Sequence, residues 1–327
     1  MSSKNRRQEK FSLAPVQEKL KVETKLDCVR QIQRDNRSML LPDRLNSDRL
    51  RVFKKETMKD RAKREEDILH APEDPVLFRK IIENLVCLQA KGLSPGAGVA
   101  AAGLAFLGRP YGTNTLEREG PERLILNLRE LDCFTFLENA VALERLVRTG
   151  ATDFADYAAA LKRLRYRKGI LDGYASRLHY FSDWLGDAEA KGFVRIMTKA
   201  LGGQHLEKSI SYMTHHRESF PALEAAETFR QMREIEERIT SELNDFLPRE
   251  KLREIEDQIQ DGDLLAITTS VDGLDVAHVG IALRQRRRVH LLHASRLAGE
   301  VLISPETLYG YLRKKKERTG VMVARVT

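Results

Sequence analysis

Apolar residues recur every three to four positions in the stretch that follows Pro75, which is the spacing of an amphipathic helix. Asp74 can cap this helix, and Pro75 suits its first turn. We expect the helix to continue to Gly92, with an apolar face made of Leu77, Ile81, Leu85 and Leu88. A second helix is predicted to start at Ser94 and to run through an alanine-rich stretch to Gly108.

A third helix is predicted to begin at Cys133, shortly after a strand. Residues 109–120 carry Pro, Gly, Asn and Thr and predict a loop, whereas the apolar residues 124–128 predict a short strand. The helix that follows has two adjoining apolar faces, so we expect it to be buried centrally. These faces consist of Phe136, Ala140, Leu143 and Val147, and of Leu137, Val141 and Leu146.

The pattern becomes that of strands in the last part of the chain. Residues 153–260 are predicted to be mostly helical, with a less regular part from about 167 to 220. Apolar stretches then alternate with polar turns, at 264–269, 276–283, 289–293, 300–303 and 320–326. This spacing predicts an antiparallel meander. The fold class is therefore α+β, with helices first, a sheet last and the helix at Cys133 packed on that sheet.

Charge divides the 327-residue chain at about residue 70. The formal net charge is +8, and residues 1–70 carry +7 of it. We interpret 1–70 as a solvated leader that is poorly ordered or loosely helical; the alternative is a basic arm that contacts phosphates or an anionic membrane. Because the remainder is nearly neutral, we expect no nucleic-acid partner. Residues 71–327 are predicted to form a single domain, with a helical insertion at about 153–260.

Several protein classes are excluded by composition. No apolar run reaches 18 residues, so no transmembrane helix is predicted. The first 30 residues lack the basic, apolar and small-residue regions of a secretory signal. Three cysteines (Cys28, Cys87 and Cys133) are too few, and odd in number, for a disulfide scaffold.

Cys133 has the setting of a reactive thiol. The helix dipole and free backbone N–H groups at a helix start stabilise a thiolate, and the same N–H groups can hold the oxyanion of a tetrahedral intermediate. Asp132 suits the N-cap, although its charge disfavours a neighbouring thiolate. Nucleophilic catalysis also needs a base and a group that orients this base.

Two histidines on neighbouring predicted strands can supply the base and its orienting partner. A hairpin turn centred between residues 285 and 286 places His278 opposite His293, on one face of the sheet. This pairing is sensitive to a shift of register. Taken singly, a Cys or a His is more often structural. A zinc site made of Cys133 and both histidines is the metal alternative, but no C-x-x-C or H-E-x-x-H spacing supports it, so we predict no metal and no cofactor.

The order of these residues resembles that of the NlpC-type bacterial cell-wall hydrolases, which have a papain-like fold. The matching motifs are Pro110-Tyr111, Asp132-Cys133, His278-Val279-Gly280-Ile281 and His293-Ala294-Ser295. The stretches 127–138, 176–181 and 268–276 are similar to the N-acetylmuramoyl-L-alanine amidase-like branch of that group. The resemblance covers residues 75–327. It implies a papain-like core, in which a cysteine-bearing helix packs on the antiparallel sheet, with helical insertions.

The resemblance implies a cysteine amidase that cuts the amide between N-acetylmuramic acid and L-alanine in peptidoglycan fragments. Cys133 would be the nucleophile, His278 the base and His293 the orienting group. Tyr111 matches a tyrosine that helps to position the substrate carbonyl or completes the oxyanion hole; a tyrosine packed under the sheet is the alternative. The same residues would serve a peptidase that cuts between D-Glu and the diamino acid of the stem peptide. A non-catalytic wall-binding module is a third hypothesis.

The stretch 176–184 is a candidate wall of the substrate pocket. Ser176, Arg177, His179 and Tyr180 suit the carboxylates and hydroxyls of a muropeptide, and on a helix 176, 179, 180 and 183 share a face. The alternative is an ordinary amphipathic helix that packs Leu178, Phe181 and Leu185 inward. Relatives of this kind usually act in the bacterial envelope after export. Because no export signal is found at the start of this sequence, the periplasm and the cytoplasm both stay open.

Overall fold

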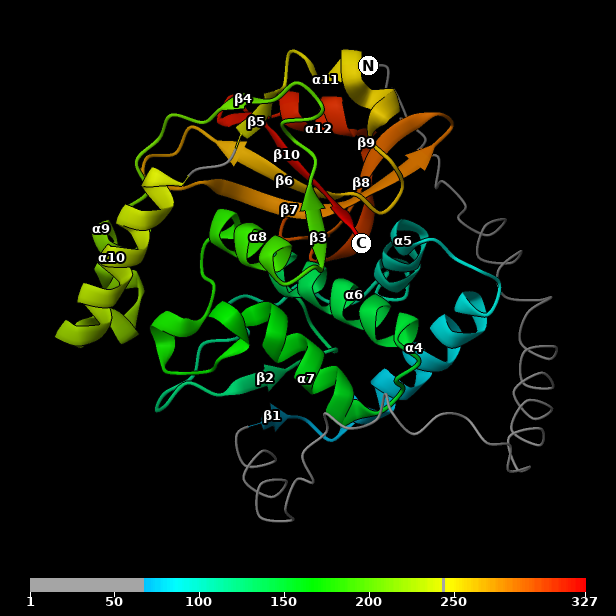
Figure 1. Cartoon of the computed structure of the whole chain (residues 1–327), viewed down its shortest axis with the longest axis horizontal. Helices are drawn as coiled ribbons and strands as arrows, with labels where there is room; N and C mark the ends of the chain where they lie inside the picture. Colours follow the sequence, from blue (N-terminus) through cyan, green and yellow to red (C-terminus); the bar gives the residue numbers. More distant parts are fainter. Residues whose placement is uncertain (1–67, 243–244) are drawn as a thin grey trace, which may run out of the picture. The chain divides into compact units, whose positions relative to one another are not determined.

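The structure is a computed structural model that describes residues 68–242 and 245–327 (Figure 1). The described residues belong to the second of two compact units of the chain, Lys59–Thr327. The predicted leader therefore lies outside the described residues, apart from Ile68–His70. These three residues form β1, which pairs in parallel with β2, Leu124–Leu126.

Helices form beside this small sheet as the apolar pattern predicts. They are α4, Glu73–Gln89; α5, Pro95–Leu104; α6, Cys133–Arg148; and α7, Phe154–Arg165. The Ser94 hydroxyl accepts a hydrogen bond from the N–H of Ala97 and caps α5. Asp74 was expected as the cap of α4, but it lies within the first turn. Its carboxylate instead accepts hydrogen bonds from the N–H groups of Ala71 and Leu128, which attach α4 to the chain just after β2.

The insertion between α7 and the main sheet is less helical than predicted. Its α-helices are α8, Phe181–Ala190; α9, Tyr212–His215; α10, Ala226–Ser241; and α11, Leu252–Ile255. Its 3₁₀ turns are η1, Arg167–Gly169; η2, Tyr174–Ser176; η3, Arg217–Ser219; η4, Pro221–Glu224; and η5, Glu256–Gln258. It also contributes β3, Val194–Ile196; β4, Gln204–His205; and β5, Asp245–Pro248. These strands are too short to show a period of two in the sequence, and pairing with longer strands or with each other holds them.

The main sheet is antiparallel, but it is not a simple meander. Its long strands are β6, Leu264–Thr269; β7, Val276–Gln285; β8, Arg288–Ser295; β9, Glu300–Thr307; and β10, Arg318–Val326. β6 to β9 pair in sequence order, as predicted. β10 pairs with β6 rather than with β9, because α12, Leu308–Arg313, carries the chain back across the sheet.

The main sheet separates two apolar cores. Helices α5, α6 and α8 lie on one side of it, and α11 and α12 lie on the other (Figure 1). Along β7, Val279 and Ile281 contribute to the core that contains α6, whereas Ala282 contributes to the core beneath α12. The prediction that α6 is buried on two faces is confirmed, since Phe136 and Leu137 are both fully buried. Mixed helix and antiparallel sheet confirm the α+β class.

Candidate active site

Asp132 is the N-cap of α6, as predicted, and it forms a capping box with Thr135. The Asp132 carboxylate accepts a hydrogen bond from the N–H of Thr135 at 2.7 Å. The Thr135 hydroxyl lies 3.0 Å from the N–H of Asp132 and accepts its hydrogen bond in return. Cys133 is therefore the first residue of a well-defined helix, with backbone N–H groups that have no partner within the helix.

The sulfur of Cys133 lies against β7, where β7 and β8 separate. The β7–β8 ladder runs only from Ile281 to Gln285 on β7, so Val279 lies outside it. The N–H of Val279 interacts with the Cys133 sulfur, as do the N–H groups of Cys133 and Phe134. Burial, reinforced by the charge of Asp132, nevertheless raises the pKa of the thiol to about 12. Cys133 is thus a protonated thiol at neutral pH, and it keeps part of its surface exposed.

His278 and His293 form a direct hydrogen bond. Nε2 of His278 lies 2.6 Å from Nδ1 of His293, and the two rings meet at 86° with their centroids 4.7 Å apart. One of these nitrogens donates and the other accepts. Because Nε2 of His278 is engaged in this bond, Nδ1 is the nitrogen left to face a reacting group.

The two histidines are brought together by a register that differs from the predicted one. The pairs Ile281–Leu292 and Gln285–Arg288 show that the turn consists of Arg286 and Arg287, both with positive φ. The turn centre therefore lies one residue later than expected, and His278 is not directly opposite His293. The shift is by two positions in the pairing, so both side chains stay on one face as diagonal neighbours.

Gly280 makes room for this diagonal contact. A Cβ atom at Gly280 would lie 3.0 Å from Cβ of His293 and 2.8 Å from the carbonyl oxygen of Leu292. Any side chain at position 280 would therefore displace β8 or tilt the His293 ring away from His278.

Both imidazoles are neutral at physiological pH. Burial, with the neighbouring His293 and Arg318, lowers the pKa of His278 well below 6.5. Burial and Arg318 lower the pKa of His293 to about 4, against the opposing effect of Glu306. A neutral imidazole can act as a general base toward a protonated thiol within its reach, taking the proton while the sulfur attacks.

Tyr311 of α12 covers the histidine pair, a contact that has no signal in the sequence. The centroid of its ring lies 6.0 Å from that of His278 and 5.4 Å from that of His293. The guanidinium of Arg318 stacks on the same ring, at 3.8 Å from its centroid. Burial raises the pKa of Tyr311, against the opposing effect of Arg318, so its hydroxyl is protonated at neutral pH.

The Tyr111 loop is attached to the chain just before Cys133, and the role expected for Tyr111 stays a prediction. The N–H of Leu131 donates to the carbonyl of Pro110, and the N–H of Tyr111 donates to Gly299 between β8 and β9. These bonds attach the Tyr111 loop both to the residue before Asp132 and to the sheet. Burial, followed by Cys133 and Asp132, raises the pKa of the Tyr111 phenol to about 12, so it is a protonated hydrogen-bond donor.

The predicted helix over 176–183 does not form. Ser176 ends the 3₁₀ turn η2, residues 177–180 are extended, and α8 begins only at Phe181. The Ser176 hydroxyl accepts from the N–H of Asp172 and donates to the carbonyl of Gly173, which closes a local turn. Residues 176, 179, 180 and 183 therefore share no helix face.

Arg177 and Tyr180 have their polar atoms engaged within the protein. The buried Arg177 guanidinium contacts Glu117 at 2.7 Å and Glu122 at 3.4 Å. The Tyr180 hydroxyl donates to the buried carboxylate of Glu236 at 2.6 Å. His179 differs, because its Nε2 donates to the carbonyl of Tyr174 while Nδ1 has no partner in the described structure.

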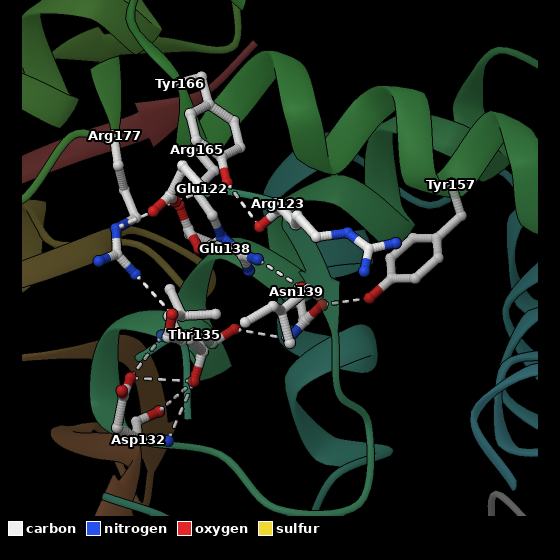
Figure 2. A network of polar contacts seen from close by, with 12 residues as sticks. Glu122, Arg123, Asp132, Thr135, Glu138, Asn139, Tyr157, Arg165, Tyr166 and Arg177 are labelled. Atoms are coloured by element: carbon white, nitrogen blue, oxygen red, sulfur yellow. Dashed lines mark hydrogen bonds and ion pairs between the residues drawn. The ribbon is translucent and has the colours of Figure 1, made fainter. Parts of the chain in front are cut away.

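Polar contacts also support α6 along its length (Figure 2). The Asn139 amide donates to the carbonyl of Thr135, and the Tyr157 hydroxyl donates to Asn139. The preceding residue of α6, Glu138, accepts from Arg165 of α7 at 2.8 Å, with both side chains buried. α6 is therefore held by its cap and by polar contacts with α7 rather than by apolar packing alone.

Within 68–242 and 245–327, no group of three or more His, Cys, Asp or Glu side chains is arranged to hold a metal ion. Over the same ranges, no helix is both long enough and apolar enough to cross a membrane.

Comparison with known proteins shows which family this chain is similar to. Residues 101–321 match the family described as AmiA-like, N-acetylmuramoyl-L-alanine amidase-like. A solved N-acetylmuramoyl-L-alanine amidase from Bacteroides uniformis is 36% identical, covers 71% of this chain and 99% of its own, and has a TM-score of 0.68. A solved Bacteroides fragilis protein, provisionally described as a xylanase, is 38% identical over 69% of this chain and 100% of its own, with a TM-score of 0.66. A Legionella pneumophila protein with 18% identity and a TM-score of 0.58, covering 81% of this chain and 96% of its own, shares the fold. No curated protein matches the chain significantly.

Proposed function

Because the chain belongs to the N-acetylmuramoyl-L-alanine amidase-like family, we propose that it is a cysteine amidase acting on peptidoglycan fragments. The bond cut would be the amide between N-acetylmuramic acid and L-alanine. The observation that carries this proposal is the hydrogen bond between His278 of β7 and His293 of β8. The residue after His278, Val279, directs its N–H at the Cys133 sulfur. The thiol, base and orienting group of a papain-like hydrolase would then be Cys133, His278 and His293.

The first chemical step is attack of Cys133 on the lactyl carbonyl carbon of the muramoyl group. Nδ1 of His278 takes the thiol proton as the sulfur–carbon bond forms, since thiol and imidazole are both neutral beforehand. The carbonyl oxygen becomes an oxyanion, and the N–H groups at the start of α6 are suited to hold it. Tyr111, protonated and close to Cys133, would donate to the same oxygen or position the carbonyl.

The second step releases the peptide. The imidazolium of His278 gives its proton to the alanine nitrogen, the carbon–nitrogen bond breaks, and a muramoyl thioester remains on Cys133. Water, deprotonated by the now neutral His278, then attacks the thioester carbonyl and restores the thiol. His293 would hold the His278 ring in orientation through both steps, and Tyr311 would limit access of water to the pair.

The segment 176–180 enters the proposal as one wall of the substrate site. His179 is the member best suited to touch substrate, because its Nδ1 has no protein partner in the described structure. Ser176, Arg177 and Tyr180 would support that wall, since their polar groups already bind the protein. The segment joins the loop after Tyr111 through the Arg177 guanidinium, which donates to the carbonyl of Leu116 at 3.0 Å.

The bond that is cut can be identified from the products of one defined substrate, N-acetylmuramoyl-L-Ala-γ-D-Glu-diaminopimelate. The proposal predicts N-acetylmuramic acid and an intact tripeptide, detected by mass spectrometry. N-Acetylmuramoyl dipeptide and free diaminopimelate would instead establish the peptidase alternative, which the same three residues would serve. Xylan is the control substrate, because one relative is described as a xylanase. Saturable binding of muropeptide without product would favour the wall-binding module.

A further inference from the structure

A second site lies on the side of the main sheet that carries α11 and α12. It is a shallow, open cavity of about 470 Å³, between the end of β9, the start of β8 and these two helices. This volume falls within the range of small-ligand sites, which is roughly 300–1,000 Å³. None of its lining residues belongs to the candidate active site.

The lining of this cavity is strongly cationic. Arg253, Arg288, Arg313 and Lys314 all line it, together with Tyr309, Thr307 and Gly310, and none of the lining residues is acidic. A concave surface that carries charge of one sign concentrates counter-ions of the other sign.

Two of the four cations already have carboxylate partners. Arg288 forms an ion pair with Glu256 at 3.0 Å, and Lys314 forms one with Glu306. In the described part of the chain, neither Arg253 nor Arg313 has a carboxylate within ion-pair distance. Their guanidinium carbons instead lie 4.2 Å and 5.8 Å from the centroid of the Tyr309 ring. Stacking on a ring holds a guanidinium in place but leaves its charge uncompensated.

We propose that this cavity binds the phosphate group of a phosphate ester through Arg253 and Arg313. A phosphate monoester carries about −1.5 to −2 charge near neutral pH and matches two uncompensated arginines, whereas a carboxylate balances only one. Guanidinium forks donate paired hydrogen bonds to phosphate oxygens. The phosphate can come from a free ester or from a lipid headgroup. The site does not depend on the proposed amidase activity, since it shares no residue with it.

The test measures binding of inorganic phosphate to the full chain by isothermal titration calorimetry, at constant ionic strength. We expect saturable binding to the wild type, and binding about tenfold or more weaker for Arg253→Gln/Arg313→Gln. Arg230→Gln/Arg233→Gln on α10 removes the same charge at exposed positions and should bind like the wild type. Arg253→Lys/Arg313→Lys should retain part of the affinity. Thermal unfolding checks that each variant is folded.

Two further arms identify the ligand and its source. Sodium acetate should not compete with phosphate at equal concentration; equal competition would overturn the phosphate assignment. Vesicles of phosphatidylcholine with phosphatidic acid, whose headgroup is a phosphate monoester, identify a lipid source if their binding needs Arg253 and Arg313. Phosphate binding without vesicle binding identifies a free ester as the source. Equal phosphate affinity in the wild type and both glutamine variants would overturn the proposal, as would vesicle binding without saturable phosphate binding.

Discussion

Nε2 of His278 lies 2.6 Å from Nδ1 of His293, although the two residues are diagonal rather than opposite in the β7–β8 hairpin. The contact exists because the hairpin turns at Arg286 and Arg287 and because Gly280 has no side chain to separate the rings. The His278 ring is thereby fixed with Nδ1 free. In the proposed amidase, this is the nitrogen that receives the thiol proton.

Loss of the His293 ring should lower the rate of the chemical step. For His293→Ala we expect kcat to fall by about 10²- to 10⁴-fold, with KM little changed, because His278 loses its orienting hydrogen bond. His293→Asn can still hydrogen-bond and should lose less. Steady-state kinetics on a defined muropeptide measures both values. If the alanine variant keeps the wild-type kcat, His293 does not orient the base.

A methyl group at position 280 should disturb the same contact. In Gly280→Ala the added carbon meets His293 and the backbone of Leu292, so we expect kcat to fall about tenfold and the unfolding free energy to fall by about 1–3 kcal/mol. Gly186→Ala on α8 is the matched control, because a Cβ there has no neighbour within 4 Å. Equal kcat values for the two variants would show that the space at 280 is unimportant.

The value of kcat/KM should depend on pH only in the acidic range. His278 must be neutral to act as the base, and its pKa lies well below 6.5, so kcat/KM should be constant through neutral pH and fall only well below pH 6.5. A profile of kcat/KM against pH measures this limb. A limb centred at or above pH 6.5 would show that His278 is solvated or that another group is the base.

The same histidine shifts affect folding stability. His293 binds a proton at about pH 4 when folded and at about 6.5 when unfolded, so protonation favours the unfolded chain between these values. The stability contributed by neutral His293 is thus complete above pH 6.5 and is lost as the pH falls to about 4. Denaturant unfolding at several pH values should show this slope, and His293→Asn should reduce it.

Replacing only one partner of the buried ion pair Glu138–Arg165 should lower the free energy of unfolding strongly. Arg165→Met leaves the Glu138 carboxylate buried without its partner, and we expect a loss of about 3–5 kcal/mol in the free energy of unfolding. Glu138→Leu/Arg165→Met removes both charges and should recover much of that loss. Guanidinium unfolding of the two variants tests this. Equal stability of both would mean that the pair does not anchor α6.

The groups of the candidate site can be identified in the sequence because each has a local signal, and their catalytic roles stay predictions. Cys133 follows an N-cap aspartate and opens an apolar helix, and both histidines lie in apolar runs with a strand pattern. The register was mispredicted because the tract Arg284–Arg288 is uniformly polar and does not show which two residues form the turn. The error left the histidines on one face only because it moved the pairing by two positions.

Other features of the fold and of the candidate site depend on tertiary contacts, which leave no local signal in the sequence. α12 has six residues and lies between two strands, so neither the cover of Tyr311 over the histidines nor the return of β10 to β6 was visible. The stretch 176–183 was read as a helix from its spacing of apolar residues. It is extended at 177–180, where the Arg177 and Tyr180 side chains bind Glu122 and Glu236 on distant segments.

The most direct test of the central claim compares the wild type with Cys133→Ala on N-acetylmuramoyl-L-Ala-γ-D-Glu-diaminopimelate, with product followed by mass spectrometry. Circular dichroism confirms that the variant is folded. The proposed mechanism predicts that the wild type releases N-acetylmuramic acid and tripeptide and that the variant releases neither above the uncatalysed background. Release of the same products by Cys133→Ala at the wild-type rate would contradict it.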